Sequence, residues 1–99
     1  AEREEKEAAA MKQEFKRLRS VSKSYDEQGA IFFACRNFER QPKKTQDKIR
    51  RLCAAAGPEY AQALLAYLTT DISWERTCME YGLSQETLTR LRRRFYDAW

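Results

Sequence analysis

Polar and basic side chains gather along residues 84–94, which combine hydroxyl groups, one amide, one carboxylate and four guanidinium groups. These side-chain types recognise duplex DNA, because glutamine and arginine bond to base edges while arginine also neutralises phosphates. Leu88, Leu91 and Phe95 follow one another at spacings of three and four, so a helix over residues 84–98 has an apolar inner side. The sequence therefore predicts a helix that turns its polar residues outward, towards DNA.

The outward residues divide by their position along this predicted helix. Residues near the N-terminus of a recognition helix lie against base edges in the major groove. The predicted base readers are Gln85, Thr89 and Arg90. The predicted phosphate contacts are Arg92, Arg93 and Arg94. Glu86 has two interpretations, since it could accept a hydrogen bond from cytosine N4 or favour the positive end of the helix dipole. Ser84 and Thr87 complete the predicted DNA-binding set of this helix.

The helix over residues 84–98 needs a neighbouring helix to hold it in place. The pattern of residues 73–81 predicts such a helix directly before it in the sequence. Ser73 and Ser84 are suitable N-caps, because a serine hydroxyl accepts a hydrogen bond from a first-turn amide. Cys78 is a small residue where two helices could touch, and Gly82 provides a turn. We therefore expect a helix-turn-helix over residues 73–99. The residues of its first helix that we expect to face the core are Trp74, Thr77, Cys78 and Tyr81.

Positive charge also collects earlier in the chain, although the net charge of the protein is only +4. Residues 36–53 carry seven Lys or Arg against Glu39 and Asp47, whereas residues 54–71 carry only Glu59 and Asp71. If the helix of this basic stretch flanks the DNA groove, it supplies further phosphate contacts. These predicted contacts are Lys43, Lys44, Arg50 and Arg51. For the arginines of residues 90–94, a solvated basic face is the alternative.

Length and composition narrow the classes of protein. Ninety-nine residues form one small domain, too small for a large catalytic cleft, and the chain has no histidine. Cys35, Cys53 and Cys78 are widely spaced in apolar patterns, so we expect free thiols in a reducing cytoplasm rather than a metal site. No apolar run approaches the roughly 20 residues of a membrane span. The composition favours a cytoplasmic protein that is not an enzyme and needs no cofactor.

The apolar periodicity is helical throughout, which predicts an all-α fold of about five to six helices. We expect two parts, a charged N-terminal helix over residues 1–28 and a helical core over residues 29–99, with Gly29 as the break. Met11 is a candidate initiator, which leaves open whether residues 1–10 are native. An apolar stripe from Met11 to Tyr25 fits either the core of the same chain or a homodimer seam through residues 11–28.

Three further helices are expected in the middle of the chain. Residues 30–41 carry three phenylalanines, Phe32, Phe33 and Phe38, and predict a central core helix that Pro42 ends. The next helix runs from residue 43 to residue 56, and Gly57 closes it. Pro58 then opens a helix over residues 58–70 that packs on several sides.

The segment from Phe32 to Trp99 resembles the short helix-turn-helix proteins of bacterial phages and mobile elements, whose C-terminal part is similar to region 4 of sigma factors. The residues that carry this resemblance are Phe38-Glu39-Arg40-Gln41-Pro42, the apolar helix Tyr60 to Leu68, Tyr81-Gly82-Leu83-Ser84 and Leu91-Arg92-Arg93-Arg94-Phe95-Tyr96. The resemblance implies a bacterial or phage regulator that binds promoter or operator DNA with its second helix. Sigma-type motifs usually have Glu-Ile-Ala where this chain has Arg76-Thr77-Cys78, and a repressor or accessory activator fits better than an independent sigma factor.

These observations predict a sequence-specific regulator that binds double-stranded DNA, with dimerisation expected because one short helix reads few base pairs. The alternative is a protein-interaction module, for example a phage-encoded inhibitor that docks its basic surface on a host nucleic-acid enzyme. The same fold serves both functions, so the outward residues must decide between them.

Overall fold

The computed structural model describes residues 17–19 and 21–99. In this part the chain forms five α-helices and two short 3-10 helices, without a strand. The α-helices are α2 (Tyr25–Arg36), α3 (Lys43–Ala56), α4 (Ala61–Thr69), α5 (Trp74–Tyr81) and α6 (Gln85–Ala98), and the 3-10 helices are η1 (Phe38–Arg40) and η2 (Pro58–Tyr60). The prediction of an all-α fold is confirmed.

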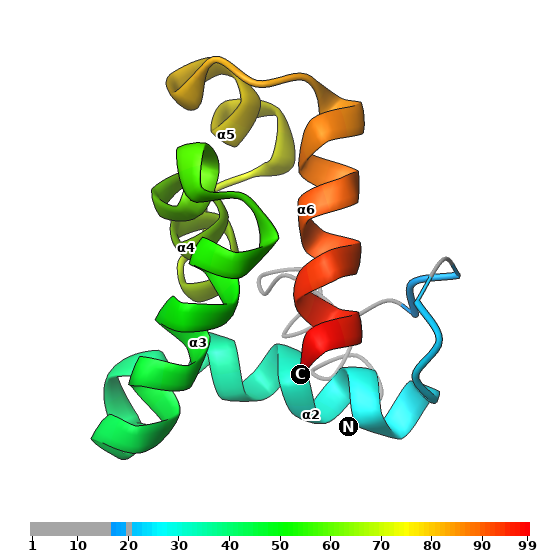
Figure 1. Ribbon diagram of the computed structural model, residues 1–99, viewed down its shortest axis with the longest axis vertical. Coiled ribbons are helices and arrows are strands. Elements are labelled where there is room, and N and C mark those ends of the chain that lie inside the picture. The colour runs from blue at the N-terminus through cyan, green and yellow to red at the C-terminus, as the bar shows by residue number, and fades with distance from the viewer. Residues whose placement is uncertain (1–16, 20) are drawn as a thin grey trace, which may run out of the picture.

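The helices form a bundle in which α6 runs upright along one side of α3 and α4 (Figure 1). Helix α3 packs against α4 and α6, and α4 also contacts α2 and α5. Helix α2 crosses one end of the bundle, while α5 and the turn that follows it lie at the other end (Figure 1). The polar start of α6 is therefore held at the end of the molecule opposite to α2.

Helix α2 begins at a capping box that the periodicity did not reveal. The Ser24 hydroxyl accepts from the Glu27 amide at 3.2 Å, and the Glu27 carboxylate accepts from the Ser24 amide at 3.4 Å. This reciprocal pair starts a helix at Tyr25 that runs through Gly29. The predicted break at Gly29 is therefore wrong, because the local capping signal outweighs the helix cost of a single glycine.

The segment before α2 is not helical in residues 17–19 and 21–24, so the predicted continuation of the N-terminal helix through this segment is wrong. The buried Gln28 side chain bonds to the backbone of this non-helical segment. Its oxygen accepts from the Leu18 amide at 2.7 Å, and its nitrogen donates to the carbonyls of Leu18 and Lys23. Val21 is buried and Leu18 packs on the same core. The part of the apolar stripe before residue 17, which begins at Met11, lies outside the residues that the structure describes.

The core side of α2 differs from the prediction based on its phenylalanines. Gln28, Ile31 and Cys35 are buried, at helical spacings of three and four, whereas the Phe33 side chain is 56% exposed. Phe32 lies beside the buried stripe and contacts the Phe33 ring edge-on. The density of aromatic residues was misleading because the rotation of the helix, and not its composition, decides which side faces the core.

Two predicted helices have other bounds in the structure than expected. Helix α2 ends at Arg36, and residues up to Arg40 continue as η1 instead of the α-helix predicted up to Gln41. Pro58 opens η2, so the helix predicted over residues 58–70 begins only at Ala61. Gly57 ends α3 as predicted. None of the helices in the described residues is long and apolar enough to cross a lipid bilayer.

Candidate nucleic-acid interface

Helices α5 and α6 are joined by a short turn whose geometry follows from three residues. Gly82 has φ +64° and ψ +41°, the left-handed conformation that glycine adopts without steric cost. The next amide, that of Leu83, donates to the Cys78 carbonyl at 3.1 Å, which is the long bond of a Schellman motif. Leu83 itself is buried. The turn is therefore closed by backbone bonds and fixed to the core by one apolar side chain.

Both helices start at the predicted serine caps. The Ser73 hydroxyl accepts from the Arg76 amide and the Ser84 hydroxyl from the Thr87 amide, each at 3.1 Å. Ser84 also lies 2.9 Å from the Thr87 hydroxyl. Ser84 and Thr87 thus take part in starting α6, which leaves the residues beyond them to contact a ligand.

The inner sides of the two helices are largely as predicted. Leu88, Leu91 and Phe95 of α6 are buried, and so is Thr77 of α5, whose hydroxyl donates to the Ser73 carbonyl at 2.8 Å. Tyr81 was expected in the core, but its side chain is 40% exposed. It is the last residue of α5, directly before the Gly82 turn.

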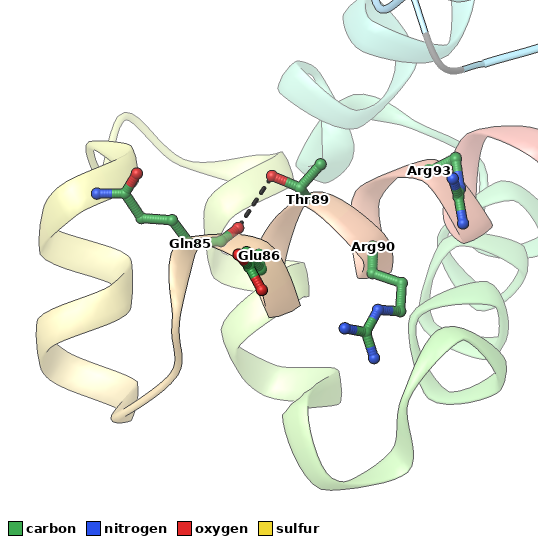
Figure 2. A pocket seen from close by; sticks show the side chains of 5 residues that line it. All are labelled: Gln85, Glu86, Thr89, Arg90 and Arg93. Atoms are coloured by element: carbon green, nitrogen blue, oxygen red, sulfur yellow. Dashed lines mark hydrogen bonds between the residues drawn. The ribbon is translucent and has the colours of Figure 1, made fainter.

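A hollow of about 400 Å³ lies on the outward side of α6. Its lining residues are Gln85, Glu86, Thr89, Arg90 and Arg93. All five are exposed, and Figure 2 shows their side chains projecting from the first turns of α6. Three predicted base readers and one predicted phosphate contact are thus brought together on one surface, which we call the outer face.

The outer face carries groups available for a ligand. Among the described residues, the guanidinium groups of Arg90 and Arg93 and the carboxylate of Glu86 have no hydrogen-bond or ion-pair partner. The Thr89 hydroxyl donates to the Gln85 carbonyl at 2.9 Å, so this threonine offers its methyl group and its oxygen lone pair. Two positive charges against one negative charge make the outer face attractive to an anion.

Arg92 and Arg94 are placed differently from Arg93, although all three were predicted to hold phosphates. The Arg92 guanidinium lies over the Trp74 ring, 4.6 Å from its centroid, and the same indole makes a T-shaped contact with the Tyr67 ring. This stack joins α4, α5 and α6. The Arg94 guanidinium donates to the Ala56 carbonyl at 3.1 Å, at the end of α3. Both arginines therefore have structural contacts within the protein.

The basic residues of α3 fall on two sides of that helix. The Lys48 ammonium lies 4.2 Å from the centroid of the Trp99 ring, which identifies the side of α3 that borders the end of α6. Lys44 and Arg51 are four and three residues from Lys48 and share its side. Lys43 and Arg50 lie on the other side of α3. There the Arg50 guanidinium lies over the Phe38 ring of η1 and 3.9 Å from the Asp47 carboxylate.

The buried thiols are poorly suited to chemistry. Burial raises the pKa of Cys35 to about 12, with a further contribution from Cys53, and burial alone raises the pKa of Cys53 to about 12. Thiols with such pKa values are protonated at neutral pH, and only the thiolate is a nucleophile or a metal ligand. Within the described residues, no group of three His, Cys, Asp or Glu side chains is arranged to hold a metal ion.

Sequence reasoning missed the aromatic partners of Arg92 and Lys48, because tryptophan and cation lie far apart in the sequence and meet only through helix packing. It also missed the anchoring of the N-terminal segment on α6, where the Ser22 amide and hydroxyl donate to the Asp97 carboxylate at 3.2 Å. Comparison of the chain with protein-family models, curated proteins and solved structures finds no match.

Proposed function

We propose that the protein is a sequence-specific DNA-binding regulator that places α6 in the major groove of duplex DNA. The observation that supports this most is the outer face, where an amide, a hydroxyl and two guanidinium groups project from α6 and where the guanidinium groups of Arg90 and Arg93 have no partner among the described residues. Two capped helices joined by a glycine turn hold that surface rigidly.

The roles of the side chains follow from their places. Gln85 and Arg90 read base edges, since both lie within two turns of the start of α6. Arg93 holds a phosphate from the same face. Lys44 and Arg51 extend the contact with the sugar-phosphate backbone, because their side of α3 borders α6. The proposal includes a regulatory role in the cytoplasm. The protein would repress bacterial or phage promoters or act there as an accessory activator.

Salt dependence of duplex binding tests the proposal. Each phosphate contact contributes a slope of about −0.9 to the dependence of log affinity on log salt. Arg93→Ala should therefore make the slope shallower by about 0.9 for every duplex. Arg90→Ala should instead change which base is preferred at one position of a site selected from random duplexes. Arg50→Ala is the matched control, because it removes the same charge from the far side of α3.

Two results would count against this function. The absence of duplex affinity at low salt would exclude DNA as the ligand of the outer face. Equal losses for Arg50→Ala and Arg93→Ala would show that net charge, and not the placement of α6, governs binding. The symmetry and half-site spacing of the selected DNA would also give the number of bound subunits.

We propose dimerisation through the N-terminal stripe as a separate part of this function. Leu18 and Val21 pack on the core of their own chain, so the stripe residues that precede them, Met11 and Phe15, are the ones to change. Sedimentation of a double serine variant at these two positions tests the seam without removing core residues. A dimer that persists unchanged in this variant would refute it.

Protein docking is a second candidate function, favoured by one observation on α5. The Met79 side chain is 83% exposed and Tyr81, two residues later, is 40% exposed. Exposed apolar side chains of this kind contribute to protein interfaces. A partner whose co-purification is abolished by Met79→Ser but not by Arg93→Ala would favour docking through α5 over DNA binding through α6.

A further inference from the structure

A second hollow, of about 330 Å³, lies beside α6 at the corner where α3 ends and η2 begins. Its walls are largely apolar and include Pro58, Tyr60 and Leu91. Gly57 contributes to the space, because a Cβ atom there would lie 2.5 Å from the Leu91 Cδ2 atom. The absence of that side chain lets the corner of α3 approach α6 while the wall stays smooth.

The rim of the second hollow is charged. Arg90 and Arg94 line it from α6, and Glu59 lines it from η2. The Arg94 guanidinium is oriented by its bond to the Ala56 carbonyl, whereas Arg90 has no partner among the described residues. Two guanidinium groups against one carboxylate give this apolar space a positive rim.

We propose that the second hollow binds a small aromatic carboxylate. The aromatic ring would lie against Tyr60 and Leu91, and the carboxylate would accept hydrogen bonds from Arg90 and Arg94. Ligand sites usually enclose about 300 to 1,000 Å³. A volume at the lower end of this range suits one or two fused rings and excludes a large cofactor.

Occupation of the second hollow would regulate DNA binding, an inference that rests on the proposed function. Arg90 lines both the second hollow and the outer face. One guanidinium cannot serve a carboxylate in the hollow and a base edge in the groove at the same time. The carboxylate should therefore weaken binding to the preferred DNA site, and bound DNA should weaken carboxylate binding by the same factor.

The ligand site can be tested without DNA. In amide NMR spectra of the full chain, 2-naphthoate, which is anionic at pH 7, should shift the signals of Gly57, Tyr60 and Leu91. The neutral isostere 2-naphthamide should bind about tenfold more weakly, because it lacks the charge that pairs with the arginines. Equal binding of the two probes, or shifts scattered over the surface, would overturn the proposal.

Two neighbouring arginines provide matched variants. Arg94→Met removes a charge from the second hollow and should weaken 2-naphthoate binding about tenfold. Arg93→Met removes the same charge from the outer face and should leave that affinity unchanged. Because Arg94 also anchors the end of α3, Tyr60→Ala serves as a second variant, and it should weaken the acid and the amide alike. Equal effects of the two arginine variants would refute the assignment.

Competition with DNA tests the regulatory part. At a concentration that half-saturates the parent protein, 2-naphthoate should lower the affinity for the selected duplex, still do so in Arg93→Met, and have little effect in Arg94→Met. Shifts at the second hollow without any loss of DNA affinity would overturn the coupling through Arg90. If no duplex binds at all, the proposed function fails, and the NMR titration alone decides the carboxylate site.

Discussion

Three consecutive arginines should respond differently to the same substitution, alanine, because their surroundings differ. Arg92 lies over the Trp74 ring and Arg94 bonds to the Ala56 carbonyl, whereas Arg93 has no partner among the described residues. Each change removes one positive charge and the same side-chain atoms from the same helix. The comparison therefore isolates the contacts of each arginine within the fold.

The structure gives the expected magnitudes. A cation over an indole contributes about 0.5–1 kcal/mol at an exposed site and about 2 kcal/mol when desolvated. Arg92 is partly buried, so Arg92→Ala should lower the free energy of unfolding by about 1–2 kcal/mol. Arg94→Ala loses one charged hydrogen bond at an exposed side chain, which costs about 1 kcal/mol. Arg93→Ala should stay within about 0.5 kcal/mol of the parent protein.

Urea unfolding followed by tryptophan fluorescence and circular dichroism measures these differences. For a domain of this size, 1 kcal/mol corresponds to a shift of about 4–8 °C in Tm. DNA binding should show the opposite order, with Arg93→Ala reducing the affinity about 3.5-fold more at 50 mM than at 200 mM salt. Equal destabilisation by all three substitutions would refute the division of the arginines into structural and ligand-binding groups.

Three other substitutions or conditions test the packing. Gly57→Ala should cost about 1–3 kcal/mol in urea unfolding, because the new methyl group would overlap Leu91; an unchanged midpoint would contradict the close approach of α3 and α6. Gly82→Ala should cost about 1–2 kcal/mol for its left-handed backbone alone, since no atom lies within 4 Å of the added carbon, and Gly82→Asn should recover part of that loss. Burial raises the pKa values of Cys35 and Cys53 from about 9 to about 12, so the folded protein keeps both thiols protonated at a pH where the unfolded chain ionises them. The stability of the fold is therefore fully present below about pH 9 and decreases as the pH rises from about 9 towards 12. The parent protein is compared with a variant that has serine at both positions. If the difference between their unfolding free energies stays constant over this alkaline window, the burial of the thiols is contradicted.

Local signals in the sequence specify several elements of this fold. Ser73 and Ser84 start two helices because their hydroxyls accept nearby amide protons, and Gly82 turns the chain because it tolerates positive φ. The leucines of α6 mark its inner side by their spacing. These features depend on residues within about one or two turns of each other, so they can be predicted without knowledge of the rest of the fold.

Packing between distant segments decided the remaining features. The charge of Arg92, Arg93 and Arg94 is evident from the sequence, but only the approach of α5 and α3 to α6 assigns the first and last of them to Trp74 and Ala56. The second hollow likewise requires the corner after α3 to lie beside α6. The sequence by itself determined that the fold is helical, where α5 and α6 begin and which side of α6 is polar. The tertiary structure determined which polar groups stay free to bind a ligand, because that depends on neighbours about forty or fewer residues away along the chain, whose positions no local pattern encodes.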